Sequence, residues 1–255
     1  MRPAGRRWSA RGRVLAGLAA FSMLAGACGG ADETPQAPPA GSEAVSFTSA
    51  DGVALQGRLF GDGSVGVVLS HMRPADQTSW WDFAQDLADE GYLVLTYDFR
   101  GYCPGGSGGC SEGERDLGAI WQDVIGAVEL IRSRGVRRVM LIGASMGGTA
   151  SLLAAAQEGV DADVVITLSA PAAFEGMVLN ADVLTHVSAA KLFVAGSGDG
   201  SAAEDAQRLY DESPLPKRVE ILTTDDHGTD ILDGNQSGRA RTLILTYLEQ
   251  YSSAA

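Results

Sequence analysis

Residues 139–147 read Val-Met-Leu-Ile-Gly-Ala-Ser-Met-Gly, an apolar run that leads into a Gly-x-Ser-x-Gly pentapeptide centred on Ser145. The run predicts a buried strand, and the Ala- and Leu-rich residues 146–157 predict a helix directly after it. A turn this tight strains its serine and leaves room only for small residues two positions before and after it, here Gly143 and Gly147. The pattern predicts a nucleophilic serine at the start of a helix, where the helix dipole favours negative charge. The alternative is a glycine-rich turn with an incidental serine.

Short apolar runs, typical of buried strands, alternate with segments whose apolar residues recur at helical intervals. This alternation extends on both sides of the turn, from residue 44 to residue 255. Strands are expected at residues 45–49, 53–60, 65–70, 92–97, 139–143, 164–169, 192–195 and 219–222. Helices are expected at residues 81–88, 117–131, 146–157, 201–210 and 242–251, with capping boxes formed by Ser111 with Glu114 and by Ser201 with Glu204. This alternation predicts one α/β domain, with a mostly parallel sheet of about eight strands flanked by helices on both faces.

A serine hydroxyl needs a base to become nucleophilic, and the chain offers three histidines. His227 follows the last predicted strand and comes after Ser145 in the chain, so we expect it to be the base. His71 follows the strand at 65–70 and precedes the serine, and His186 lies in the connection after residues 164–169. We expect neither of these two to act as the base.

The imidazole of a catalytic histidine is usually oriented by a carboxylate. Asp199 lies in the loop directly after the predicted strand at 192–195, at the sheet edge that also holds Ser145. Asp225 and Asp226 are alternatives because they precede His227. Residues adjacent in sequence rarely point at the same ring edge, so Asp199 is the preferred acid and the other two are expected to cap the loop.

The order of Ser145, Asp199 and His227 along a strand-and-helix alternation resembles the α/β-hydrolase superfamily over residues 44–255. The resemblance implies an α/β-hydrolase fold and an oxyanion hole made by the backbone N–H groups of Met72 and Met146. Met72 stands in Leu69-Ser70-His71-Met72, where relatives often carry glycine, and its side chain would narrow the acyl pocket. His71 is then expected to hold this loop in place.

Cys103 and Cys110 flank a glycine-rich insert that replaces the end of the superfamily's Asp-x-Arg-Gly-x-Gly loop, which begins here at Asp98. In an exported protein a bridge would pin such a loop, so we predict a Cys103–Cys110 disulfide. The alternative, a metal pair, lacks further cysteine or histidine ligands nearby. No metal is expected.

Only about twenty residues, 171–190, separate two predicted strands where many relatives insert a helical cap. The segment has room for one short helix containing Phe174, Met177, Val178 and Leu179, with His186 on the surface, so a minimal cap is expected. Trp80 and Trp81 follow the predicted oxyanion loop. Their expected role is to pack a helix, and lining the substrate pocket is the alternative.

The N-terminus resembles an export signal. Residues 1–27 combine five arginines with an uncharged apolar run that is too short to span a membrane comfortably, which is typical of a signal peptide. Small residues then precede Cys28, which resembles a bacterial lipobox, so we expect a lipid on Cys28 and a flexible tether over residues 28–43. The expected location is the cell envelope, and secretion after an ordinary signal peptide is the alternative.

The composition excludes several classes of protein. The 255 residues carry a net charge of −13, and without residues 1–27 they keep 14 basic and 32 acidic residues, a net charge of −18. Such a body repels phosphate backbones, so nucleic-acid binding is not expected. With 45% apolar and 20% charged residues the chain is globular rather than disordered.

These observations together predict a serine hydrolase, a carboxylesterase for small or medium acyl esters that works through an acyl-enzyme. The expected partners are a small acyl substrate and the membrane, through the lipid on Cys28; no cofactor is expected, and the protein is expected to be a monomer. A peptidase or thioesterase would use the same triad. A catalytically silent envelope binding protein is an alternative of another class, but such a protein would usually have lost a triad residue.

Overall fold

The computed structural model of the protein describes residues 37–103 and 110–252. The predicted signal peptide, Cys28 and residues 29–36 of the predicted tether lie outside the described residues, as does the insert between Cys103 and Cys110. Among the residues that are described, no helix is both long enough and apolar enough to cross a membrane.

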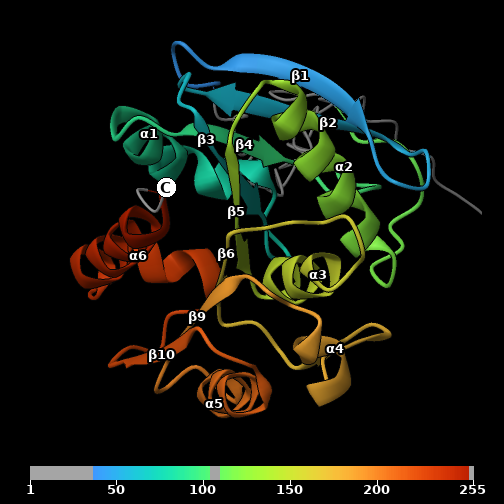
Figure 1. The fold of residues 1–255 in the computed structure, drawn as a ribbon. Coiled ribbons are helices and arrows are strands. Elements are labelled where there is room, and N and C mark those ends of the chain that lie inside the picture. The colour runs from blue at the N-terminus through green and yellow to red at the C-terminus, as the bar shows by residue number, and fades with distance from the viewer. Residues whose placement is uncertain (1–36, 104–109, 253–255) are drawn as a thin grey trace, which may run out of the picture. The chain divides into compact units, whose positions relative to one another are not determined.

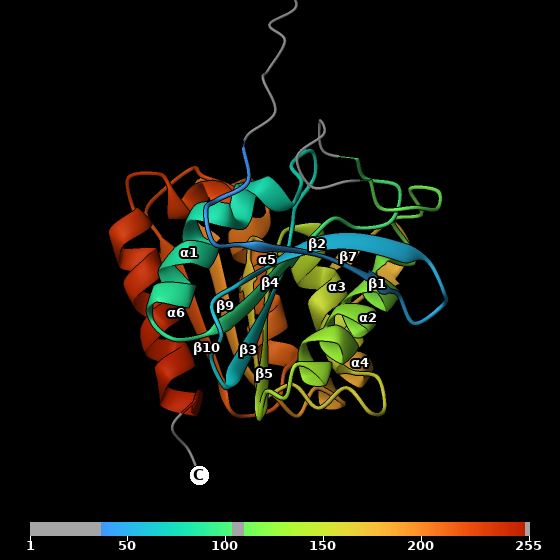
Figure 2. The ribbon, with the colours of Figure 1, turned by 90° about the horizontal axis from the view of Figure 1, so that it is seen from above.

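Eight strands form the central sheet, in the spatial order β1-β2-β4-β3-β5-β6-β9-β10 (Figures 1 and 2). β1 and β2 pair antiparallel to their neighbours, and all later strands pair in parallel, as the strand-and-helix alternation predicted. The strands are β1 (Glu43–Thr48), β2 (Ala54–Phe60), β3 (Val65–Ser70), β4 (Leu93–Tyr97), β5 (Arg138–Ala144), β6 (Val164–Leu168), β9 (Ala190–Gly196) and β10 (Lys217–Leu222).

Helices cover both faces of this sheet (Figures 1 and 2). They are α1 (Trp81–Asp89), α2 (Ile120–Ser133), α3 (Met146–Ala155), α4 (Ala181–Thr185), α5 (Ala202–Glu212) and α6 (Ser237–Ser252), with short 3-10 helices η1 (Gln77–Trp80) and η2 (Gly228–Leu232). α1 and α6 pack on one face, while α2, α3 and α5 pack on the other. The expected fold class is therefore confirmed.

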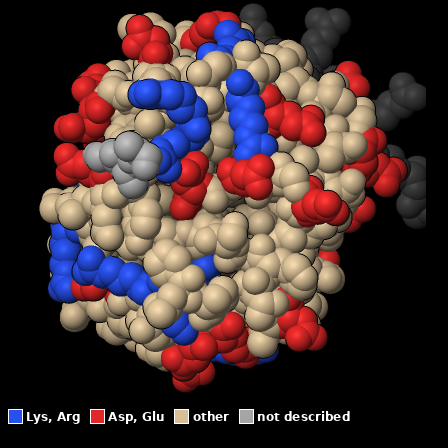
Figure 3. Space-filling view, in the orientation of Figure 1, with Lys and Arg blue, Asp and Glu red and all other residues tan. Residues whose placement is uncertain are grey.

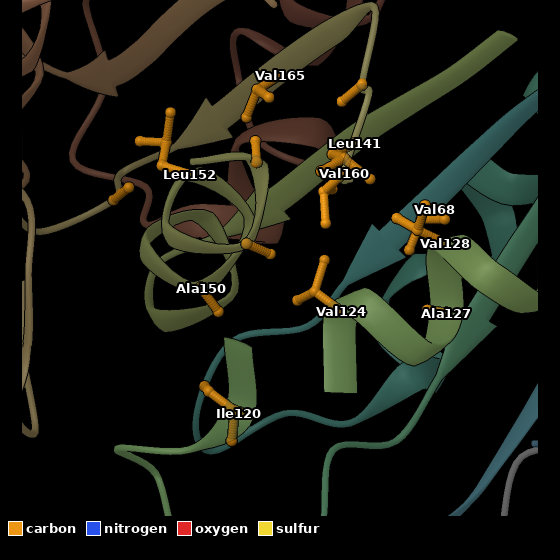
Figure 4. Packing of buried hydrophobic residues seen from close by; sticks show 14 of the residues in the cluster. Val68, Ile120, Val124, Ala127, Val128, Leu141, Ala150, Leu152, Val160 and Val165 are labelled. Atoms are coloured by element: carbon orange, nitrogen blue, oxygen red, sulfur yellow. The ribbon is translucent and has the colours of Figure 1, made fainter. Parts of the chain in front are cut away.

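Adjacent residues of the central strands point to opposite faces, which explains why these strands are apolar throughout. Val67 contributes to the core beneath α1 and α6, whereas Val68 contributes to the core beneath α2 and α3. Figure 4 shows this second core, where Val68 and Leu141 of the sheet lie near Val124 of α2. A strand with two buried faces cannot shift by one residue without exchanging its two apolar surfaces.

Trp80 and Trp81 are completely buried in the core beneath α1 and α6. They therefore pack the helix layer, which was their expected role. The indole N–H of each has no hydrogen-bond partner in the described part of the chain.

Neither predicted capping box forms. The predicted helix after Ser111 begins only at Ile120, because the Ser111 hydroxyl accepts a hydrogen bond from the Gln56 N–H (3.0 Å) and donates to the Asp98 carbonyl (2.7 Å). Ser201 does precede α5, but its own backbone is helical, with φ −86° and ψ −1°, and its hydroxyl caps no N–H of the first turn. A capping serine normally takes an extended conformation.

The predicted helix containing Phe174 and Leu179 is also wrong. The chain instead forms a small hairpin of β7 (Ala173–Phe174) and β8 (Met177–Val178), followed by the single short helix α4. Glu175 and Gly176 make the turn with φ of +45° and +88°, the two left-handed residues that a tight hairpin requires. His186 is exposed at the end of α4, as expected.

A buried ion-pair network joins three parts of the chain near the ends of β1 and β4. The Arg100 guanidinium, with 5% of its side chain exposed, donates to Asp123 of α2 at 2.6 and 2.9 Å and to Asp51 at 2.6 and 2.7 Å. The Arg100 N–H also donates to Asp123 at 2.9 Å. The Asp123 side chain is completely buried, so its charge depends on this arginine.

We predict that Arg100→Met lowers the free energy of unfolding by about 3 kcal/mol, since it leaves the Asp123 carboxylate buried without its partner. Urea denaturation followed by circular dichroism measures this loss. Arg100→Met combined with Asp123→Leu should recover part of it, because no unpaired charge then remains. A single variant within about 0.5 kcal/mol of the wild type would contradict the importance of the network.

Candidate active site

Ser145 occupies the turn between β5 and α3 in a conformation that side-chain-bearing residues rarely adopt, with φ 48° and ψ −120°. A Cβ atom at Gly143 would overlap the carbonyl of Gly147, and one at Gly147 would overlap the carbonyls of Ser70 and His71. Both predicted glycines are thus required by close backbone approach. The strained serine stands, half-buried, at the N-terminus of α3.

His227 and Asp199 form a pair at the same edge of the sheet. Asp199 follows β9, His227 follows β10, and Nδ1 of the histidine lies 2.9 Å from both carboxylate oxygens. A carboxylate can only accept, so Nδ1 carries a proton and donates it, and in the neutral ring Nε2 is then the acceptor. The Asp199 side chain is 13% exposed and that of His227 is 40% exposed, so the ring can reach a molecule arriving from solvent.

The two other acids near His227 do not contact its ring. Asp226 accepts a hydrogen bond from the Thr224 hydroxyl (2.5 Å), and Asp225 lies against Gly198 in the neighbouring loop. Of the three carboxylates that the sequence offered, the structure brings only Asp199 to the imidazole.

The segment after His227 packs onto the turn that holds Ser145. Gly228, with φ +57°, approaches so closely that a methyl group there would lie 3.3 Å from the Ala144 Cβ and would overlap the Met72 sulfur. Its N–H donates to the Ser169 hydroxyl at 3.1 Å. No hydrogen bond joins Ser145 to His227 within the described residues, a contact that often tightens only when substrate binds.

Ser169 is a site residue that the sequence analysis missed. It follows β6 at the carboxyl edge of the sheet and is buried, with φ +56°. Its hydroxyl holds the Gly228 N–H and so fixes the segment that carries His227. Its position at the end of a predicted strand was the one available signal.

Met72 and Met146, the predicted oxyanion-hole residues, lie on either side of the elbow, directly after β3 and at the start of α3. The backbone N–H groups of both residues lack an acceptor among the hydrogen bonds of the described chain. Both side chains are buried, and that of Met72 packs against Gly228. Two unpaired donors beside a strained serine can stabilise a negatively charged oxygen.

His71 holds the loop that carries Met72. Its Nδ1 donates to the Met72 carbonyl (2.8 Å), its Nε2 accepts from the Phe99 N–H (3.1 Å), and its ring packs against Phe99 and Tyr102. Complete burial lowers the pKa of this histidine to about 4, so the ring is neutral at ordinary pH. Both ring nitrogens are used internally, which leaves none to serve as a base.

Asp98 supports the same loop from its far end. Its carboxylate accepts hydrogen bonds from the N–H (3.0 Å) and the side-chain amide of Gln77, at the start of η1. Burial raises the pKa of this carboxyl to about 7, against the opposing effect of the Gln77 hydrogen bonds. The carboxyl therefore changes its protonation state near neutral pH.

We predict that Asp98 makes the stability of the fold depend on pH. Its pKa in the folded state, about 7, exceeds its ordinary value of 3.8, so the folded state binds more protons between these pH values. The stabilisation is complete at low pH and is lost as pH rises towards 7. Relative to Asp98→Asn, the wild type should lose about 2 kcal/mol of stability between pH 5 and 7, and the loss per pH unit becomes smaller as the pH approaches 7.

Urea denaturation of both proteins at pH 5, 6 and 7 measures this difference. A constant gap between wild type and Asp98→Asn across the three pH values would show that the carboxyl does not titrate in this range.

A disulfide joins Cys103 and Cys110, in agreement with the sequence. The residues that flank the disulfide are connected to the site. The Tyr102 carbonyl accepts a hydrogen bond from the Ser111 N–H (3.0 Å), and the Tyr102 hydroxyl lies 4.0 Å from the Met146 sulfur. The bridge thus fixes the ends of a loop beside the predicted oxyanion donors. In the described part of the chain, no three histidine, cysteine, aspartate or glutamate side chains are grouped so that they could hold a metal.

Comparisons with known proteins agree with this architecture. The profile of the serine aminopeptidase S33 family matches residues 66–216, more than half of the chain. The chain therefore belongs to this family, within the α/β-hydrolase superfamily. A search among curated protein sequences finds no match.

Solved structures share the fold at low sequence identity. An esterase from Pyrococcus furiosus is 18% identical, with a TM-score of 0.69 over 82% of this chain and 91% of its own. An esterase from Thermogutta terrifontis is 18% identical, with a TM-score of 0.66 over 82% and 99%. An enol-lactonase from Burkholderia xenovorans is 16% identical, with a TM-score of 0.65 over 80% and 99%.

Proposed function

We propose that the protein, a hydrolase by its family, is a serine carboxylesterase that cleaves small or medium acyl esters. The observation that carries this proposal is the His227–Asp199 pair, whose free Nε2 stands at the sheet edge of the strained Ser145. The Ser145 oxygen attacks the ester carbonyl as its proton passes to His227 Nε2. Asp199 stabilises the imidazolium that forms.

The negative charge on the carbonyl oxygen is held by the free N–H groups of Met72 and Met146. When the tetrahedral intermediate collapses, the bond to the alcohol breaks and His227 protonates the departing oxygen. Water then attacks the acyl-enzyme, giving its proton to the same Nε2, and the acid is released as Ser145 regains its proton.

Two considerations favour esters over peptides. The structural relatives include esterases and a lactonase, which act on carboxylic esters. An aminopeptidase, as the family description reads, must also bind a positively charged α-amino group. Arg73 and Arg115, whose charges act on Tyr102, would repel such a group, and the one acid whose charge acts on His71, Asp76, is bonded to Thr78. A peptidase or thioesterase with the same triad and a silent binding protein remain the competing functions.

We predict that Ser145→Ala lowers kcat/KM for p-nitrophenyl butyrate by about 10⁴- to 10⁶-fold, because the nucleophile is lost. His227→Ala should lose a similar factor. Asp199→Asn should lose about 10⁴-fold, since the carboxylate that fixes the ring is gone. Steady-state hydrolysis, with a series of acyl chain lengths, measures these losses.

Two matched variants serve as controls. Ser133→Ala removes an exposed serine hydroxyl at the end of α2, and His186→Ala removes the exposed histidine at the end of α4. Both should keep wild-type kcat/KM. Equal activity of Ser145→Ala and wild type would exclude the proposed nucleophile, and no hydrolysis by the wild type would favour a binding protein.

We further propose that the protein is exported and anchored to a membrane by a lipid on Cys28. This proposal is supported by the basic segment, the short apolar run and the small residues that precede the cysteine. The acidic, proline-containing residues that follow would let the catalytic domain stand off the membrane surface.

We predict that Cys28→Ala moves the protein from the membrane fraction to the soluble fraction, because the thiol that would carry the lipid is missing. Fractionation of expressing cells with immunodetection measures the change. Ser22→Ala, a small substitution within the same apolar run, is the control and should stay in the membrane fraction. Unchanged membrane association of Cys28→Ala would exclude the lipid anchor.

A further inference from the structure

Two arginines lie beside the proposed oxyanion hole. Arg73 directly follows Met72, and its guanidinium lies 5.7 Å from the centre of the Phe174 ring in the β7–β8 hairpin. Arg115 lies 4.1 Å from the centre of the Tyr102 ring, whose hydroxyl reaches the Met146 sulfur. The two cations thus come from two separate loops, and each lies over an aromatic ring.

Both guanidinium groups act on the same phenol. Burial raises the pKa of Tyr102, and the positive charges of Arg115 and Arg73 lower it. Their fields therefore overlap around the Tyr102 hydroxyl, beside Met146.

Arg73 differs from the other arginines of the described chain. It alone, among the arginines in residues 37–103 and 110–252, donates no hydrogen bond, and it forms no ion pair. On the face seen in Figure 3, in contrast, most basic side chains lie next to acidic ones. An exposed arginine that pairs with no acid among the described residues can bind an external anion.

Arg115 is almost as free. It is exposed, it forms no ion pair within the described residues, and its one hydrogen bond, to the Gly101 carbonyl, is 3.4 Å long. None of the acids nearest in sequence forms an ion pair with either arginine within the described residues, including the exposed Glu114 next to Arg115. Asp76 caps η1 by accepting from the Thr78 N–H (2.8 Å), and Asp116 accepts from the Gly118 N–H (3.1 Å).

We propose that Arg73 and Arg115 form an anion subsite that selects esters carrying a carboxylate away from the reacting carbonyl. This inference rests on the proposed esterase function and names the substrate class of the same site. A guanidinium binds a carboxylate through two parallel hydrogen bonds, and the Phe174 and Tyr102 rings support the two guanidinium planes.

The acidic body sets what such a subsite must overcome. A net charge of −18 beyond the predicted signal peptide repels anionic substrates at long range. Two arginines that form no ion pair within the described residues, and whose charges act on Tyr102, counter that repulsion locally.

The carboxylate could belong to either half of the ester, and two pairs of substrates separate these cases. For the alcohol half, 4-carboxyphenyl butyrate is compared with the neutral 4-carbamoylphenyl butyrate. For the acyl half, monoethyl adipate is compared with the neutral ethyl adipamate. Within each pair the two esters have nearly the same size, and kcat/KM is measured for wild type, Arg73→Gln, Arg115→Gln and the double variant.

In at least one pair the wild type should have a higher kcat/KM for the charged ester than for the neutral one. In the double variant the ratio of these two kcat/KM values should be about tenfold smaller. Hydrolysis of the neutral ester should stay within roughly twofold, which shows that the variants are folded and active. Arg137→Gln is the matched control, because this exposed arginine, bonded to Ser64, lies at the opposite end of β5 and should keep the full preference.

A wild type that prefers the neutral ester in both pairs, or a double variant with unchanged preference, would overturn the subsite while leaving the esterase function intact. Hydrolysis of none of the four esters by the wild type would overturn the proposed function, and the subsite with it. The pair in which the preference is seen identifies the half of the substrate that carries the charge.

Discussion

The close approach of backbone to backbone at the turn after β5 is the constraint on which the rest of the site depends. Gly147 touches the carbonyls of Ser70 and His71, and Gly143 touches Gly147, so β3, β5 and α3 meet without intervening side chains. This contact forces Ser145 into its strained conformation and places it beside the loop after β3. Replacing either glycine would separate the serine from that loop.

Around this contact the site is assembled from the carboxyl ends of neighbouring strands and held by buried polar groups. His71 joins the Met72 loop to the end of β4, Ser169 holds the segment after His227, and Asp98 anchors the start of η1. These groups meet no solvent, so each satisfies another buried group. The exposed part of the site is small: most of it is the His227 ring, while Ser145 is half-buried.

Much of this arrangement could be predicted from the sequence because its signals are local. Apolar strands, helical spacing and the glycines around Ser145 identified the sheet, its helices and the order of Ser145, Asp199 and His227. The errors arose where tertiary contacts decide. Ser111 bonds to Gln56 of β2 and to Asp98, just after β4, instead of capping a helix, and a turn at Gly176 makes a hairpin where a helix was expected. Whether Arg73 forms an ion pair depends on acids in distant segments of the chain, so no local sequence pattern predicts it.

The central claim is that Ser145 is the nucleophile of a working site. The most direct measurement is to react the full-length protein with a fluorophosphonate and to map the modified peptide by mass spectrometry. The account predicts a single adduct on Ser145, which disappears when His227 is replaced by alanine, because the hydroxyl then lacks its base. An adduct on another residue, or none on the folded wild type, would contradict it.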